Sequence, residues 1–284
     1  MIVLSHLQVA PMLKARAEGA EVFSVSLDLN CTRSEVRLGA EGVVFPDGQH
    51  LSWEALEEIH AHETACYLIQ DNTAERIVFF SEAFQRTYSL LPTENAPTML
   101  LAGFPMHRIK GIDPQEDTRR KIGAVAPIIG RVLDTATGLG YTAIEAAKTA
   151  AEVVTIELDP VALEVARRNP WSQELFTDSR IKQRIGDAFE VVQTLEDRSF
   201  DRILHDPPTF RLAGQLYSER FYTQLFRVLK RGGRLFHYIG DLDSASGRSV
   251  AKGVVRRLQQ AGFQQVERAQ DAFGLTARKS DRNG

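Results

Sequence analysis

One stretch of this chain decides its fold: Val132-Leu133-Asp134-Thr135-Ala136-Thr137-Gly138-Leu139-Gly140-Tyr141-Thr142-Ala143. An apolar run leads into an acid, then into two glycines one residue apart, and then into an apolar segment of helical character. This order is typical of a buried strand that turns sharply into a helix, where glycine lets the backbone approach a ligand closely. The glycines also fit a dinucleotide fingerprint. Asp134 argues against that alternative, because a carboxylate there would repel a pyrophosphate and face a cationic or hydroxyl-bearing ligand.

Three more strand ends with polar tips follow downstream. A β-branched run ends in Glu157, which lies 23 residues after Asp134, where a carboxylate is placed to accept hydrogen bonds from ribose hydroxyls. A third strand ends at Ile185 and leads into Asp187, and a fourth ends at His205 and leads into Asp206. Four such tips in chain order predict a crevice along one edge of a parallel sheet.

This combination resembles the class I S-adenosylmethionine-dependent methyltransferases over roughly residues 118–284. The resemblance implies S-adenosyl-L-methionine as cofactor, with the acid and the glycine loop near its methionine part. It implies a ribose contact at Glu157 and an adenine contact at Asp187 and Ala188. The full cofactor-binding set expected from it is Asp134, Thr135, Thr137, Gly138, Gly140, Tyr141, Glu157, Asp187, Ala188 and Asp206.

The segment from His205 to Phe210 bears on the acceptor. It is similar to the Asp/Asn-Pro-Pro-aromatic motif of amino-group methyltransferases, in which a side-chain oxygen and a proline carbonyl hold the target nitrogen towards the methyl group. The resemblance implies that Asp206, Pro207 and Pro208 are catalytic. Thr209 stands in the aromatic position, so stacking on adenine is not implied. A proline-terminated strand with a capping aspartate is the alternative interpretation.

A second resemblance covers residues 216–222 and 229–233, which look like the corresponding segments of spermidine-synthase-like proteins. Aminopropyl transferases, however, carry a Gly-Gly-Gly-Asp-Gly style loop, and an Asp-Ser type acceptor site where Pro207 and Pro208 stand here. We therefore expect methyl transfer to a nitrogen or oxygen acceptor. The alternatives are aminopropyl transfer and a non-catalytic methyltransferase-like binding module.

Composition narrows the function further. The chain is 43% hydrophobic, with only two cysteines and no apolar run of membrane-spanning length, so a cytoplasmic protein without membrane partners is the default. Residues 121–284 contain no cysteine, which argues against methylation of pyrimidine carbon 5. Residues 1–120 carry 10 Lys and Arg against 17 Asp and Glu, a balance that does not favour nucleic acid. The spacing of His60 and His62 does not favour a metal site.

The predicted fold class is α/β: a doubly wound, mostly parallel sheet with a closing antiparallel hairpin at 264–268 and 274–278, preceded by a smaller β-rich domain. We expect that N-terminal domain to span residues 1–115 and to cover the site and select the acceptor, and the catalytic domain to span 116–284. Helices are predicted at about 141–150, 160–169, 187–195, 217–230 and 247–261, and the glycines at 232 and 233 are expected to end the fourth of them. In the N-terminal domain, Ser52 is expected to cap a short helix through Ile59, and residues 65–70 and 76–80 are expected to form a hairpin. Further candidates for acceptor contacts, each with a structural alternative, are Phe210, His237, Tyr238, Asp241 and Asp243.

Overall fold

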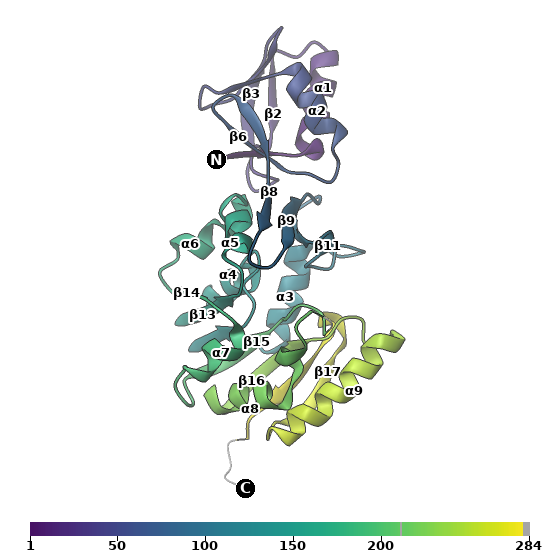
Figure 1. Ribbon diagram of the computed structural model, residues 1–284. Helices are drawn as coiled ribbons and strands as arrows, with labels where there is room; N and C mark the ends of the chain where they lie inside the picture. Colours follow the sequence, from purple (N-terminus) through teal and green to yellow (C-terminus); the bar gives the residue numbers. More distant parts are fainter. Residues whose placement is uncertain (211, 281–284) are drawn as a thin grey trace. The chain divides into compact units, whose positions relative to one another are not determined.

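The computed structural model describes residues 1–210 and 212–280 and divides into two compact units. The N-terminal unit comprises Met1–Gln115 with Val161–Gln173, and the second, which we call the sheet unit, comprises Glu116–Pro160 with Glu174–Gly284. Figure 1 traces the chain through both. The short segment 161–173 therefore packs with the N-terminal unit although it lies between two strands of the large sheet in sequence. Trp171 contributes to this packing, since its indole Nε1 donates to the carbonyl of Leu29 at 2.8 Å.

The sheet unit contains a seven-stranded sheet in the order β14-β13-β12-β15-β16-β18-β17. The strands are β12 (Arg131–Asp134), β13 (Glu152–Glu157), β14 (Ile181–Ile185), β15 (Phe200–His205), β16 (Leu229–Tyr238), β17 (Gln264–Ala269) and β18 (Gly274–Arg278). The first five pair in parallel, while β18 is antiparallel to both of its neighbours. The central strands are nearly continuous runs of buried Val, Ile and Leu, as expected of a parallel sheet covered on both faces. The predicted α/β class, mostly parallel sheet and closing hairpin are confirmed.

Helices of the sheet unit connect these strands. They are α3 (Pro114–Ala124), α4 (Tyr141–Ala147), α6 (Gln173–Thr177), α7 (Ala188–Gln193), α8 (Glu219–Val228) and α9 (Ala245–Gln260), with the 3₁₀ turns η2 (Gly214–Tyr217) and η3 (Gln270–Ala272). Helix α8 packs against both α7 and α9, and α9 lies along β17 (Figure 1). Ser218 and Ser244 cap α8 and α9 by accepting from backbone amides.

One predicted boundary in this unit is wrong. The glycine pair 232–233 was expected after a helix ending near 230, but α8 ends at Val228 and β16 begins at Leu229. Phe200 pairs with Leu229 and Arg202 already pairs with Arg234, so residues 230–233 bulge out of the ladder. Gly232 has a φ of 72°, which a side chain rarely adopts, so the glycines serve the bulge and not a helix end.

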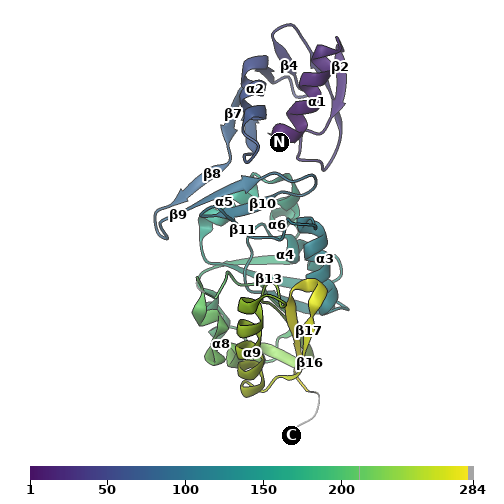
Figure 2. The same cartoon turned by 90° about the vertical axis from the view of Figure 1, so that its right-hand side faces the viewer.

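The N-terminal unit is built from three small antiparallel sheets, β1-β6-β7, β2-β3-β4-β5 and β11-β10-β9-β8. Its strands are β1 (Ile2–Leu4), β2 (Val22–Val25), β3 (Ser34–Leu38), β4 (Gly42–Val44), β5 (His50–Ser52), β6 (Tyr67–Gln70), β7 (Thr73–Arg76), β8 (Val78–Ser81), β9 (Arg86–Leu91), β10 (Thr98–Leu101) and β11 (Phe104–Pro105). Its helices are α1 (His6–Ala17), α2 (Trp53–Ala61), α5 (Pro160–Arg167) and the 3₁₀ turn η1 (Pro170–Ser172). Helices α1 and α2 contact each other and lie side by side in the view of Figure 2, which is turned by 90°.

Two features of this unit differ from the sequence-based expectation. Helix α1 was not predicted, although Ser5 and Gln8 form a complete capping box at its start. The strand at 67–70 pairs with 73–76 and not with 76–80, because Asp71 and Asn72 form a tight two-residue turn with positive φ at both positions. The predicted cap at Ser52 is confirmed.

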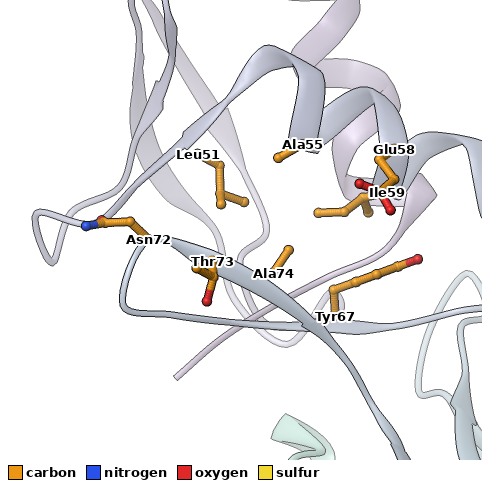
Figure 3. A pocket seen from close by; sticks show the side chains of 8 residues that line it. All are labelled: Leu51, Ala55, Glu58, Ile59, Tyr67, Asn72, Thr73 and Ala74. Atoms are coloured by element: carbon orange, nitrogen blue, oxygen red, sulfur yellow. The ribbon is translucent and has the colours of Figure 1, made fainter.

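A pocket of about 260 Å³ lies inside the N-terminal unit, between α2 and the β6–β7 hairpin. Figure 3 shows its lining, which includes apolar side chains such as Leu51 and Ile59 and the polar side chains of Glu58 and Thr73. Its lining residues fall within 51–74, so it contains none of the predicted site residues. Among residues 1–210 and 212–280, no helix is both long and apolar enough to cross a membrane.

Candidate active site

The sheet order brings the four predicted strand ends to one edge. Parallel pairing places Asp134 beside Thr155 and Leu204, and Glu157 beside Ile185. The carboxyl ends of β14, β13, β12, β15 and β16 therefore line up, and the segments that follow them lie along the same edge. This is the edge at which ligands bind in open α/β sheets.

The glycine loop after β12 has the geometry that the sequence predicted. Gly138 and Gly140 have φ angles of 53° and 79°, which lie in the left-handed region that favours glycine. A Cβ at Gly140 would lie 2.7 Å from the side chain of Leu175. The amide of Gly140 donates to the carbonyl of Thr137 at 2.7 Å and closes the turn. The loop therefore needs glycine at position 140 for both conformation and space.

Asp134 lies beneath this loop and is fully buried. Its Oδ2 accepts from the hydroxyls of Thr142 and Thr155, each at 3.0 Å, while its Oδ1 has no hydrogen-bond partner among the described residues. Burial raises the pKa of Asp134 to about 7, against the opposing effect of the two hydroxyls and of the nearby backbone amide of Ala136. The carboxyl group is thus poised between its charged and neutral forms near neutral pH.

The other loop residues predicted to bind the cofactor are also buried. Thr137 exchanges a hydrogen bond of 2.7 Å with Thr155, and Thr135 contacts His205 Nδ1 at 2.6 Å. Tyr141 is 2% exposed at the start of α4. These side chains support the loop from below, so the groups that the loop can present to a ligand are chiefly backbone atoms.

Glu157 ends β13 and is held by the backbone. Its Oε2 accepts from the amide of Gly138 at 2.9 Å and its Oε1 from the amide of Asp159 at 3.1 Å. Burial raises the pKa of Glu157, and these amides oppose the effect. Leu158 follows as an exposed apolar side chain. A hydroxyl-bearing ligand at this position would find a carboxylate already aligned.

Asp187 caps α7, with its Oδ1 accepting from the amide of Phe189 at 2.8 Å. Its Oδ2 accepts from Gln215 Nε2, also at 2.8 Å, so a residue of η2 reaches this strand end as well. Ala188 is buried at the first position of the helix. Asp187 is therefore a helix cap at this strand end, and Gln215 is a contact that the sequence did not indicate.

Asp206 follows β15, and its side chain is 20% exposed. Its Oδ2 lies 2.6 Å from Nζ of Lys121, a residue of α3 that was not among the predicted site residues. Lys121 is 2% exposed and also lies 2.8 Å from Oδ2 of Asp117, which is fully buried. Burial opposes the ammonium form, and the carboxylates of Asp206 and Asp117 outweigh it, so the pKa of Lys121 is raised. The spacing of Asp117 and Lys121 is that of an ordinary surface pair on a helix, which is why the sequence did not single them out.

The prolines after Asp206 are anchored by Tyr217, whose hydroxyl donates to the carbonyl of Pro208 at 3.1 Å. Phe210 is 49% exposed and packs edge-on against the ring of Tyr217, with centroids 5.4 Å apart. Pro207 lies between the anchored Pro208 and the ion-paired Asp206. The segment is therefore fixed at both ends by side chains from distant positions.

Two buried histidines lie behind this segment. His205 Nε2 donates to the carbonyl of Leu216 at 3.0 Å, so Nδ1 of the neutral ring accepts from the hydroxyl of Thr135. Burial lowers the pKa of His205 to about 3, and burial likewise lowers that of His237. Nε2 of His237 lies 2.8 Å from the hydroxyl of Tyr222. Both histidines are fully buried, and these hydrogen bonds fix the orientation of their rings.

The remaining candidates for acceptor contacts, at the end of β16 and in the loop after it, differ in whether they lie near the ion pair of Lys121. The ring of Tyr238 lies 4.7 Å from Nζ of Lys121 and so borders the ion pair. Asp241 accepts from the amide of Asp243, and Asp243 contacts Arg268 at 2.9 Å. Those two aspartates are exposed and shape their own loop.

Comparisons with known proteins agree with this geometry. Residues 130–268 match a family described as a methyltransferase domain. "Uncharacterized protein MJ1233" of Methanocaldococcus jannaschii is 44% identical over 269 residues, which are 93% of this chain and 91% of the relative.

Two further similarities point to another branch of the same fold. A polyamine aminopropyltransferase of Sulfolobus acidocaldarius is 26% identical over 66% of this chain and 61% of its own length. The structure of spermidine synthase from Thermotoga maritima is 18% identical, covers 76% of this chain and 78% of its own, and superposes with a TM-score of 0.57. The chain therefore belongs to one family with the Methanocaldococcus protein, its residues 130–268 match the methyltransferase-domain family, and its fold is the one shared with the spermidine synthase structure.

Proposed function

We propose that the chain is a transferase that moves a methyl group from S-adenosyl-L-methionine to an amine nitrogen. The observation that carries the proposal is the carboxylate of Asp206, fixed by Lys121 at the end of β15, one strand away from Asp134 and the glycine loop. A fixed acceptor of N–H hydrogen bonds beside a donor site is what amine alkylation requires. Oxygen acceptors fit less well, because a hydroxyl offers a single hydrogen for Asp206 and Pro207 to share.

The residues around the loop suit an adenosyl sulfonium donor. Oδ1 of Asp134 is a buried oxygen without a partner among the described residues, and Glu157 presents a carboxylate held by two amides. When bound, such a donor supplies an electrophilic carbon on sulfur: the nitrogen lone pair forms the new bond, the carbon–sulfur bond breaks with its electron pair on sulfur, and the nitrogen releases a proton. In this proposal Thr135, Thr137 and Tyr141 support the loop, while Asp187 and Ala188 border the adenine.

On the acceptor side, the chain has two tasks. Asp206 and the carbonyl of Pro207 accept hydrogen bonds from the amine and so aim its lone pair at the donor carbon. Pro208, held by Tyr217, keeps this segment in place. Phe210 offers an exposed ring beside it that suits the apolar part of an acceptor.

Aminopropyl transfer is the second candidate, and the relatives named as polyamine aminopropyltransferases support it at least as well. Its donor is decarboxylated S-adenosylmethionine, which lacks the carboxylate of the methyl donor. Asp134, Glu157 and Asp206 border the site, and the ammonium of Lys121 is already paired with two carboxylates. The resulting negative potential also suits a donor without a carboxylate. Pro207 and Pro208 argue for the methyl donor, since an Asp-Ser type acceptor site would stand there in an aminopropyl transferase.

The two donors can be compared directly. The full chain is incubated with either donor and a panel of amines that includes polyamines, and products are identified by mass. A mass gain of one methyl group, abolished in Asp206→Ala, supports methyl transfer, whereas an aminopropyl gain assigns the second candidate. Binding of S-adenosylhomocysteine by calorimetry without any transfer to the panel or to cell-extract fractions would favour a non-catalytic binding module.

We also propose that residues 1–115 select the acceptor and that 116–284 carry the donor site. The acidic balance of the first 120 residues suits a cationic amine. Deleting this region is a poor test, because Trp171 and its neighbours pack with it. Reversing exposed charges on α2, as in Glu54→Lys with Glu58→Lys, should instead raise KM for a cationic acceptor and weaken its salt dependence, with donor affinity unchanged. An unchanged KM would remove this role from α2.

A further inference from the structure

A group of three charged side chains sits behind the acceptor segment: Asp117 and Lys121 of α3, and Asp206 after β15. Lys121 Nζ lies 2.8 Å from one carboxylate and 2.6 Å from the other. The exposed fractions of the side chains rise from 0% at Asp117 and 2% at Lys121 to 20% at Asp206. Lys121 thus bridges a fully buried carboxylate and a partly exposed one.

A buried lysine needs a counter-charge, and Asp117 alone would supply it. Removing two ions from water costs several kcal/mol per ion, and a single well-placed partner with hydrogen bonds offsets much of that cost. A second carboxylate on the same ammonium is therefore not required for burial of Lys121. Its presence at the exposed end indicates that the lysine also serves Asp206.

We propose that Lys121 is a positioning residue, backed by Asp117, that holds Asp206 as a carboxylate with Oδ2 turned inward, so that Asp206 orients an acceptor amine by accepting its N–H and does not act as its base. This inference rests on the proposed function. The proton released by the nitrogen then passes to solvent, and the acceptor must present its lone pair already free of a proton. The reacting nitrogen is therefore an amine whose neutral form is populated at the working pH, and the positive charge that suits the acidic first 120 residues belongs to another group of the same acceptor.

Other groups that face Asp206 have to be included in the test. Two of them are Asp134 from β12 and Tyr217 from η2, because the negative charge of Asp206 contributes to raising the pKa of each. The third is Tyr238 from β16, because its ring faces the ammonium of Lys121. All three are unchanged in the variants below. Any difference between those variants then reports on α3.

The matched variants are Asp117→Asn, which keeps Lys121 beside Asp206, and Lys121→Met with Asp117→Asn, which removes the ammonium without leaving a buried charge at 117. Asp206 is observed by carboxyl ¹³C NMR, and its signal is assigned by its loss in Asp206→Asn. The proposal expects the titration midpoint of that signal to lie at higher pH in the double variant than in Asp117→Asn, by about 1 to 3 pH units. Equal midpoints would overturn it.

A second measurement applies if circular dichroism shows the double variant unfolded. The ε-ammonium ¹⁵N signal of Lys121 is compared between the unaltered chain and Asp206→Asn. A lysine that serves Asp117 alone would keep its signal, whereas the proposal expects the signal to shift and its hydrogens to exchange faster. Neither measurement uses donor or acceptor, so a failure of methyl transfer and a failure of this inference are distinguishable.

Discussion

The ends of β12 and β15 are neighbours in the sheet and both lead to an aspartate, but the two carboxyl groups are held in opposite ways. Asp134 is buried and receives two threonine hydroxyls, from α4 and from the adjacent strand. Asp206 is partly exposed and accepts a hydrogen bond from the ammonium group of Lys121, which lies 85 positions earlier in the sequence. Burial, which the neutral hydroxyl donors only partly oppose, raises the pKa of Asp134 to about 7, whereas Asp206 forms an ion pair with an ammonium group. The state of the carboxyl group is therefore determined mainly by burial at the end of β12 and mainly by a neighbouring positive charge at the end of β15.

The largest effect on this comparison is expected from Lys121→Met alone. The substitution leaves the fully buried Asp117 without its ammonium, and breaking a buried pair in this way costs about 3–5 kcal/mol of unfolding free energy. Urea unfolding followed by circular dichroism measures it. Adding Asp117→Asn should restore a large part of the loss. A loss below about 1 kcal/mol would mean that water reaches Asp117.

Asp206→Ala should lower kcat for methyl transfer by about 100-fold or more, because alanine has no side-chain oxygen to accept the N–H of the amine. Affinity for S-adenosylhomocysteine, measured by calorimetry, should stay within a few-fold. Asp134→Ala is the matched variant on the donor side and should weaken that affinity instead. If Asp206→Ala removes donor binding, Asp206 contacts the donor and the assignment of Asp134 to the donor and Asp206 to the acceptor is wrong.

Asp134 should give the protein a pH-dependent stability. Its folded pKa of about 7 exceeds the usual value of 3.8, so the folded state binds the proton more tightly than the unfolded chain. The contribution of Asp134 to the unfolding free energy then falls as pH rises from about 4 to 7, by up to about 1.4 kcal/mol per pH unit. The lowered pKa values of His205 and His237 act in the opposite sense, and equally in the unaltered chain and in Asp134→Asn. Urea titrations at pH 5 and pH 7 should therefore show that the unfolding free energy of the unaltered chain, relative to that of Asp134→Asn, falls between these pH values. Parallel curves for the two proteins would contradict the raised pKa.

The smallest effect is expected from Gln215→Ala, which removes a hydrogen bond to Asp187. Because Asp187 keeps its bond to the amide of Phe189, donor affinity should fall by about tenfold at most. Calorimetry with S-adenosylhomocysteine measures the donor affinity. The control is Gln193→Ala in α7, the helix that Asp187 caps. If Gln215→Ala changes only the KM for the acceptor, Gln215 contributes to acceptor binding and not to donor binding.

Much of the sheet unit could be predicted because its signals are local. Buried runs of Val, Ile and Leu that end in an acid indicate parallel strands, and Gly138 and Gly140 indicate a turn that only glycine adopts easily. The bulge at 230–233 could not be predicted, since a glycine pair after a helical pattern also fits a helix end. The assignment of 161–173 to the N-terminal unit was equally hidden, because its packing partners, such as Leu29, are far away in sequence.

By itself, the sequence determined the α/β class, the order of polar strand ends and the glycine loop, because each depends on residues within a few positions of one another. Only the tertiary structure decided which donors reach each carboxyl group. Lys121 comes to Asp206, Gln215 to Asp187 and Tyr217 to Pro208 from other elements. The physical reason is that the same Asp–Lys spacing is a hydrated pair on an exposed helix face and a strong ion pair in the interior, where the low dielectric multiplies its effect. Burial, which sequence spacing does not report, is what makes that pair part of the candidate site.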